Sequence, residues 1–176
     1  PPVDSVLNAH NRKRHTIMKK LTLTKLAKFT DPKDIRPYCI APFQLDAFTY
    51  ATNGHVIVRV DASVLPAAPY CDTSGGKVAV SMERVMAKPT RDTVWRAVLP
   101  VAREVAVCSE VKRIVRRKEK IDRYYAVKIG EAHIQLRYWN LIASLPDAEI
   151  GEVGHAFDAV PFRFAGGIGT CMPIRM

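Results

Sequence analysis

The segment Tyr50–Val60 constrains the fold more than any other part of this 176-residue chain. It contains Asn53-Gly54 with β-favouring residues on both sides, and Asn-Gly tolerates positive φ at both central positions of a tight turn. The segment therefore predicts a β-hairpin, in which a strand over Phe43–Tyr50 is followed by a second strand over Val56–Val60. A histidine, His55, lies just past the turn.

Further turn signals predict two more hairpins, one around Gly130-Glu131 (Tyr124–Ile129 with Ala132–Leu136) and one around Gly166-Gly167 (Phe162–Ala165 with Thr170–Arg175). Short helices are expected over Leu21–Phe29, with Thr22 or Thr24 as the cap, and over Tyr138–Leu145, before Pro146. The segment Lys77–Met82 reads as a strand. These elements predict an α+β fold, with short helices placed against antiparallel strands in one domain over residues 18–176.

The formal net charge of +10 favours anionic partners, with nucleic acid first among them. Apolar residues at three- or four-residue steps predict a helix over Val101–Lys120. Its C-terminal half and the residues that follow are strongly basic: Lys112, Arg113, Arg116, Arg117, Lys118, Lys120 and Arg123. Two interpretations remain open, a helix that contacts DNA phosphates and a solvated helix end whose cations suit the macrodipole.

Residues 1–17 contain Pro1-Pro2 and a basic cluster but no apolar periodicity, so we expect a flexible basic tail or an upstream extension of the reading frame. No apolar run approaches the roughly 20 residues that span a bilayer. The four cysteines are far apart and form no C-x-x-C pair. We therefore expect reduced thiols in a cytoplasmic protein that is not a membrane protein.

The sequence contains no G-x-S-x-G elbow, H-E-x-x-H motif, phosphate-binding glycine loop or histidines at metal-ligand spacing. Asp147 and Glu149 form the one candidate carboxylate pair, and they follow a proline as a helix-end turn would. We therefore expect no enzyme activity, no catalytic residue, no cofactor and no metal. A small enzyme with residues drawn from distant parts of the chain remains the alternative.

Three stretches together resemble the bacterial DNA polymerase sliding clamp, the β processivity factor, and more closely the short clamp-like proteins of phages. Ala51-Thr52-Asn53-Gly54-His55 is similar to the family's A-T-D-G-H-R-L, and Trp95–Pro100 to its F-P-D-Y-x-R-V-L-P. The ending Cys171–Met176 is similar to V-M-P-M-R-L. Leu136–Leu141 followed by Leu145–Ile150 resembles the strand–helix–strand element of a clamp domain. The resemblance is scattered over roughly residues 45–176.

The resemblance implies a pocket that accepts a short hydrophobic peptide from a polymerase or another replication or repair protein. Its walls would be Thr52, Gly54, His55, Val56, Ile57 and Pro100, and its floor and rim Met172, Pro173, Ile174 and Arg175. The chain departs from the pattern at Asn53, Val56 and Ile174, where the family has Asp, Arg and Met. Taken without the resemblance, His55 is a surface residue beside a turn and Met172-Pro173 is the end of an edge strand.

The expected function is therefore that of a DNA replication accessory resembling a sliding clamp, with DNA as a further partner. The chain is much shorter than a three-domain clamp subunit, so a closed ring would require several copies, that is, a homo-oligomer. The alternative is a phage decoy or inhibitor that occupies a host replication protein without binding DNA. Solution mass and DNA affinity distinguish the two.

Overall fold

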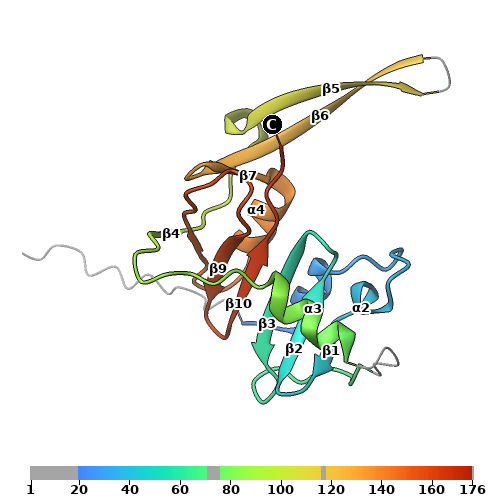
Figure 1. Cartoon of the computed structure of the whole chain (residues 1–176), viewed down its shortest axis with the longest axis vertical. Helices are drawn as coiled ribbons and strands as arrows, with labels where there is room; N and C mark the ends of the chain where they lie inside the picture. The colour runs from blue at the N-terminus through green and yellow to red at the C-terminus, as the bar shows by residue number, and fades with distance from the viewer. Residues whose placement is uncertain (1–19, 71–75, 116–117, 176) are drawn as a thin grey trace, which may run out of the picture.

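Two antiparallel sheets form the framework of the protein in a computed structural model that describes residues 20–70, 76–115 and 118–175 (Figure 1). The helical segments are short: α1 (Leu23–Leu26), a 3-10 turn η1 (Ala27–Phe29), α2 (Pro37–Ile40), α3 (Lys77–Val85), a 3-10 turn η2 (Arg103–Val105) and α4 (Leu136–Ala143). The strands are β1 (Phe43–Leu45), β2 (Phe48–Thr52), β3 (Val56–Asp61), β4 (Trp95–Ala97), β5 (Val107–Val115), β6 (Lys118–Ile129), β7 (Ala132–Gln135), β8 (Glu149–Gly151), β9 (Val160–Phe164) and β10 (Gly167–Cys171).

The larger sheet has seven strands in the order β1-β2-β3-β10-β9-β8-β4, and the smaller sheet has the order β5-β6-β7. All the pairings between these strands are antiparallel. The expected α+β class, with antiparallel sheets and short helices, is confirmed. In Figure 1 the long β5–β6 ribbon runs across the top of the molecule and extends beyond the seven-stranded sheet.

The pairing of β3 with β10 joins the N-terminal half of the chain to its C-terminus, with Val56 opposite Cys171. Side chains of β3 alternate between two apolar clusters, as the period of a strand requires. Val58 belongs to the larger cluster, which includes residues of α1, α4, β7 and β9. Ile57 belongs to the smaller one, where α3 contributes Val78 and Met82. The strand is thus covered on both faces, which holds its ends in place.

The predicted hairpins are confirmed at three places. The turn between β2 and β3 follows Thr52, the turn between β6 and β7 is at Gly130-Glu131, and β9 and β10 pair around Gly166. The second strand of this last hairpin is Gly167–Cys171 and not the predicted Thr170–Arg175, so Gly167 belongs to the strand and not to the loop. The first helix begins where expected, because Thr22 Oγ1 accepts a hydrogen bond from the Lys25 amide at 3.2 Å. Helix α4 begins two residues earlier than predicted, and the order β7–α4–β8 matches the expected strand–helix–strand element.

The prediction of a helix over Val101–Lys120 is wrong. Residues Val107–Val115 form β5, which pairs along its whole length with β6. The helix prediction rests on Val101, Val105, Cys108, Val111 and Val115. The last two are four residues apart, a spacing that suits one face of a strand as well as one face of a helix. The β-branched residues of this segment favour the pleated conformation once a partner strand is available. The basic residues therefore lie on a two-stranded ribbon, apart from Arg116 and Arg117, which lie outside the described residues.

Two smaller predictions also need correction. Lys77–Met82 is not a strand, because Lys77–Val85 forms α3, in which Val78 and Met82 are one helical turn apart and both buried. Phe43–Tyr50 is not one strand but two, β1 and β2, which meet at a tight turn where Asp46 adopts a positive φ of 53°. Aspartate tolerates this conformation better than most residues do, and the run of partly alternating residues hides the turn.

Within the described ranges, every helix is too short or too polar to span a lipid bilayer. The tail predicted for residues 1–17 lies outside the described residues.

Candidate functional site

A small cavity of about 130 Å³ lies where the β2–β3 loop, helix α3 and the segment after β10 meet. It is lined by residues from four regions of the chain: Arg36, Tyr38, Thr52, Gly54, His55, Val56, Ile57, Ser81, Met82, Val85, Thr170 and Met172. We call it the apolar cavity. It brings together five of the residues predicted for one wall, Thr52, Gly54, His55, Val56 and Ile57, with Met172 from the C-terminal segment.

Side-chain hydrogen bonds fix the β2–β3 loop. Asn53 Oδ1 accepts from the backbone amides of His55 at 3.0 Å and Val56 at 3.2 Å. Thr52 Oγ1 donates to the Val56 carbonyl at 2.8 Å and accepts from the Gly54 amide at 3.0 Å. Only Gly54 has a positive φ, so the turn differs from the expected one with two left-handed residues. The Thr52 hydroxyl is therefore occupied inside the loop.

Strand pairing places Met172 in the cavity. Because Thr170 lies opposite Ile57 and Cys171 opposite Val56, the residue after β10 falls beside the β2–β3 loop. The Met172 amide donates to the His55 carbonyl at 2.8 Å, which extends the ladder by one bond. Thr170 is almost fully buried, and its hydroxyl accepts from the Ala87 amide at 2.8 Å. The cavity floor is thus tied both to β3 and to the end of α3.

Helix α3 supplies the side of the cavity that sequence reasoning missed. Met82 and Val85 are three residues apart, so both lie on the helix face that packs toward β3. Their spacing was the available signal, and the assignment of Lys77–Met82 to a strand concealed it. Arg36 and Tyr38 also line the cavity, although they precede the region of family resemblance and no sequence pattern marks them.

The remaining predicted pocket residues are not among those that line the apolar cavity. Pro100 lies along α4, where Trp139 Nε1 donates to the Leu99 carbonyl at 2.7 Å. Beyond Met172 and Pro173 the chain continues toward β7, because the Ile174 amide donates to the His133 carbonyl at 2.8 Å. The Arg175 guanidinium lies 5.1 Å from the centre of the Phe157 ring.

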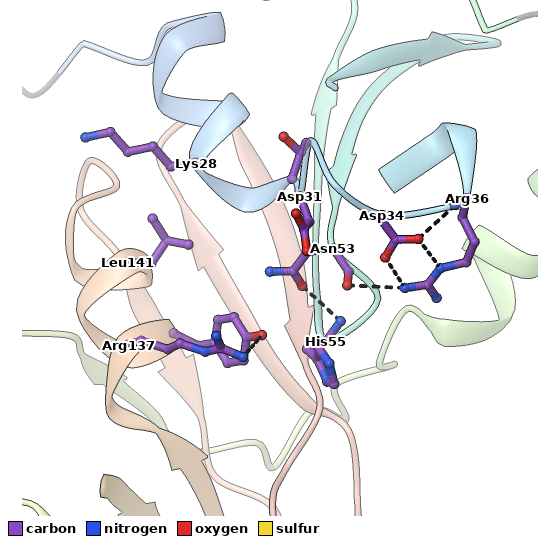
Figure 2. Close-up of a pocket in the computed structure, with 10 residues that line it drawn as sticks. Lys28, Asp31, Asp34, Arg36, Asn53, His55, Arg137 and Leu141 are labelled. Carbon is purple, nitrogen blue, oxygen red and sulfur yellow. Dashed lines mark hydrogen bonds and ion pairs between the residues drawn. The ribbon is translucent and has the colours of Figure 1, made fainter. Parts of the chain in front are cut away.

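A second, more polar cavity of about 450 Å³ adjoins the first (Figure 2). It is lined by Lys28, Thr30, Asp31, Asp34, Arg36, Asn53, His55, Arg137, Tyr138 and Leu141. Arg36 and His55 line both cavities, so the two form neighbouring parts of one surface. The exposed His55 ring stacks on Tyr138 with centroids 5.9 Å apart, and burial raises the pKa of the Tyr138 hydroxyl.

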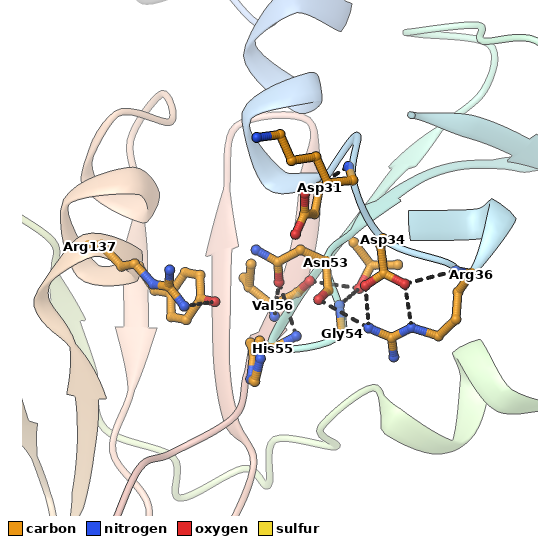
Figure 3. A network of polar contacts seen from close by, with 11 residues as sticks. Asp31, Asp34, Arg36, Asn53, Gly54, His55, Val56 and Arg137 are labelled. Carbon is orange, nitrogen blue, oxygen red and sulfur yellow. Dashed lines mark hydrogen bonds and ion pairs between the residues drawn. The ribbon is translucent and has the colours of Figure 1, made fainter. Parts of the chain in front are cut away.

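Arg36 is held in place by a two-point contact with Asp34, shown in Figure 3. Its Nε and Nη2 atoms donate to the two carboxylate oxygens at 2.9 and 2.7 Å, and Nη2 also donates to the Asn53 carbonyl at 3.4 Å. The guanidinium passes so close to Gly54 that a Cβ atom there would overlap it. Glycine is favoured at position 54 by its φ of 83°, and a Cβ atom there would also displace the Arg36 guanidinium.

The side-chain hydrogen bond from Arg36 lowers the pKa of Asp34 to about 2, from an ordinary value of 3.8. A carboxyl group with a lowered pKa in the folded state stabilises the protein above its ordinary pKa, and this effect is lost as the pH falls through about 2. We therefore expect the Asp34 carboxyl carbon, followed by NMR, to stay ionised at pH 3. In Arg36→Gln the pKa of Asp34 should rise but stay below 3.8, because the backbone amide of residue 36 still donates to Oδ1 at 2.8 Å. Titration near the ordinary value in the wild type would contradict the paired geometry.

Five of the predicted DNA-contacting residues, Lys112, Arg113, Lys118, Lys120 and Arg123, belong to the β5–β6 ribbon, which lies away from these cavities (Figure 1). Two of them are paired within the ribbon. Arg123 Nε donates to Glu110 on the opposing strand at 2.7 Å, and Lys120 Nζ lies 3.3 Å from an Asp122 oxygen. Both basic side chains are exposed, so these pairs do not remove them from contact with a solvent-borne polyanion.

Among the described residues, no group of three or more histidine, cysteine, aspartate or glutamate side chains is arranged to hold a metal ion. What the site offers instead is an apolar hollow with a cationic and aromatic rim. Comparison of the chain with protein-family models, curated proteins and solved structures found no match.

Proposed function

We propose that the chain is a replication accessory of the sliding-clamp type without enzyme activity, which captures a short hydrophobic peptide of a polymerase or repair protein. The peptide's apolar anchor would occupy the apolar cavity beside Met172, and its polar part would lie over His55 toward the larger cavity. The β5–β6 ribbon would contact DNA.

One observation carries the peptide part of the proposal. Residues chosen on the family resemblance from two distant motifs, Thr52–Ile57 and Met172, line a single cavity. The meeting depends on the register of β3 against β10, which the sequence motifs do not contain. The cavity also has suitable chemistry, since methionine and β-branched side chains form an apolar surface that adapts to different ligands.

The cavity's size also favours a peptide anchor. Sites for drug-sized molecules have volumes of about 300 Å³ or more, whereas the apolar cavity has about 130 Å³. A hollow of this size suits the apolar side chain of a peptide whose backbone runs across the surface. His55 and Arg36 stand at the boundary of the two cavities, where a peptide backbone would need hydrogen-bond partners.

The DNA part rests on charge and shape. The net charge is +10, and the segment Lys112–Arg123 contains seven basic residues, Lys112, Arg113, Arg116, Arg117, Lys118, Lys120 and Arg123, against two acidic ones, Glu119 and Asp122. A two-stranded ribbon is one of the elements that the major groove of DNA admits. The segment was predicted as a helix and forms a ribbon, but either element can contact nucleic acid.

Isothermal titration calorimetry with a synthetic peptide that carries a clamp-binding motif tests the peptide site. We expect binding by the full chain, and a Kd at least ten times higher for Met172→Ala, because truncation removes apolar contacts from the cavity wall.

The matched control is Ile168→Ala, near the start of β10 and four residues before Met172, where the side chain is 38% exposed and outside the apolar cavity. It should leave the Kd unchanged. Circular dichroism of both variants checks that they fold. No binding by the wild type, or equal effects of the two substitutions, would reject the pocket.

A further inference from the structure

Strand β5 has an unpaired outer edge. It is the terminal strand of the order β5-β6-β7, and its nine residues pair only with β6 among the described strands. In Figure 1 it lies above β6 at the base of the ribbon, on the side away from the seven-stranded sheet, and the two strands cross toward the tip. Val107, Cys108 and Glu110 are exposed at the base of the ribbon, and β6 is the one described strand with which they pair. An edge of this length presents a row of unpaired backbone donors and acceptors that can template another strand.

The edge lacks two of the features that usually prevent such pairing, a proline and a bulge. Val107–Val115 contains no proline, and the structure records one regular residue-by-residue register with β6 along it, without a bulge. It does carry charges, Glu110, Lys112 and Arg113, which restrict the strands that can lie beside it. The arrangement of these charges identifies the partner.

The sequence of β5 is complementary to itself in the antiparallel direction. With Val111 opposite Val111 of a second copy, Glu110 of each chain lies opposite Lys112 of the other. Outward from there, Ser109 lies opposite Arg113, Cys108 opposite Ile114, and Val107 opposite Val115. No like charges face each other, and each apolar residue faces another apolar residue. Both kinds of pair favour sheet formation.

We propose that β5 pairs antiparallel with β5 of a second copy of this chain, about a two-fold axis at Val111. This register is the one in which all nine residues overlap. A two-fold axis places one residue opposite its own copy. The two neighbouring symmetric registers therefore place Glu110 opposite Glu110 or Lys112 opposite Lys112, so that like charges face each other. Each of these alternatives also leaves strand residues unpaired at both ends.

The contact is isologous, since the same strand edge is used by both copies. It joins the two three-stranded sheets into one sheet of six strands in the order β7-β6-β5-β5-β6-β7. Because both ribbons are basic, their mutual repulsion opposes the pairing, and salt screens that repulsion. The dimer fraction should therefore rise with ionic strength, whereas binding of DNA falls with it.

Disulfide trapping tests the register. In the full chain with Cys108→Ser, we replace Val111 with cysteine and oxidise with copper phenanthroline in 0.5 M salt without nucleic acid. Two cysteines opposed on an antiparallel pair have Cβ atoms about 4.5–5.5 Å apart, near enough to be bridged after a small adjustment. We expect a covalent dimer on a non-reducing gel.

The matched control is Ser109→Cys in the same background. Position 109 lies on the same strand and the same face, two residues away. In the proposed register it lies opposite Arg113, so the two cysteines are four residues apart along the strand, or about 13 Å. Cross-linking of Val111→Cys should be at least ten times faster than that of Ser109→Cys.

Sedimentation equilibrium of the wild type supplies an independent readout. The mass should rise from one chain toward two as the protein concentration increases, and more so at high salt. Equal cross-linking rates for the two cysteine variants overturn the proposal, and so does the mass of a single chain at the highest concentration and salt.

Discussion

Gly169→Ala is expected to lower the free energy of unfolding by about 3 kcal/mol, at the upper end of the usual effect of overpacking. Gly169 lies in the centre of the seven-stranded sheet, opposite Val58 on one side and Phe162 on the other. A Cβ atom there would overlap the Phe162 ring and lie 2.5 Å from the Ile57 carbonyl oxygen. The ring is buried and the carbonyl belongs to a paired strand, so neither can move without disturbing β3 or β9.

The matched control is Gly154→Ala, at a position where a Cβ atom meets nothing within 4 Å. It should change the unfolding free energy by no more than about 0.5 kcal/mol, as exposed substitutions usually do. Urea unfolding followed by circular dichroism measures both variants, and an unchanged m-value shows that the midpoint shift reports stability. Equal urea midpoints for the two variants would contradict the packing of the Phe162 ring over Gly169.

Local turn chemistry explains why the hairpins could be predicted. Asn53 and Gly54 bend the chain through contacts with residues at most three positions away, and Gly130 and Gly166 likewise adopt positive φ. Such signals lie within the sequence window that a reader inspects. The predicted cap at Thr22 is local in the same way, since its partner is the Lys25 amide.

The errors arose where the apolar spacing fits both a helix and a strand, and tertiary contacts decide between them. Val111 and Val115, two of the residues that suggested the helix, also fit one face of a strand, and pairing with β6 decides for the strand. Lys77–Met82 is rich in β-branched residues, but burial of Val78 and Met82 against Phe43 and Tyr50 favours a helix. No local pattern contains that information.

The candidate site could be predicted only in part, because tertiary contacts also decide which residues line it. The family resemblance selected Thr52–Ile57 and Met172, but Pro100 and residues 173–175 do not line the cavity. Arg36 could not have been selected, because its place in the site depends on the Asp34 contact and on the space left by Gly54. Its role is set by long-range geometry, with Asn53 seventeen positions away.

The second large effect is expected for DNA binding when the ribbon's charge is reversed. Each phosphate contact by a lysine or arginine releases counterions and contributes about 0.9 to the slope of log affinity against log salt concentration. Such a contact therefore strengthens binding roughly eightfold at 0.1 M salt relative to 1 M salt. The triple variant Arg113→Glu, Arg116→Glu, Arg117→Glu removes three such charges, one within β5 and two that follow it in the sequence. We expect its affinity for a random-sequence duplex to fall by about 100-fold or more, with a salt slope lower by nearly 3.

The control variant carries the same change of net charge on another surface. Arg84→Glu, Lys88→Glu, Arg91→Glu reverses three exposed cations in and after α3, away from the ribbon. Fluorescence anisotropy across a salt series then separates a located contact from a general effect of net charge. If DNA binds only through overall charge, both triple variants lose the same affinity.

If the wild type binds the clamp-motif peptide but has no affinity for DNA at low salt, the ribbon is not a DNA contact. The decoy alternative then accounts for the pocket better than a processivity role does.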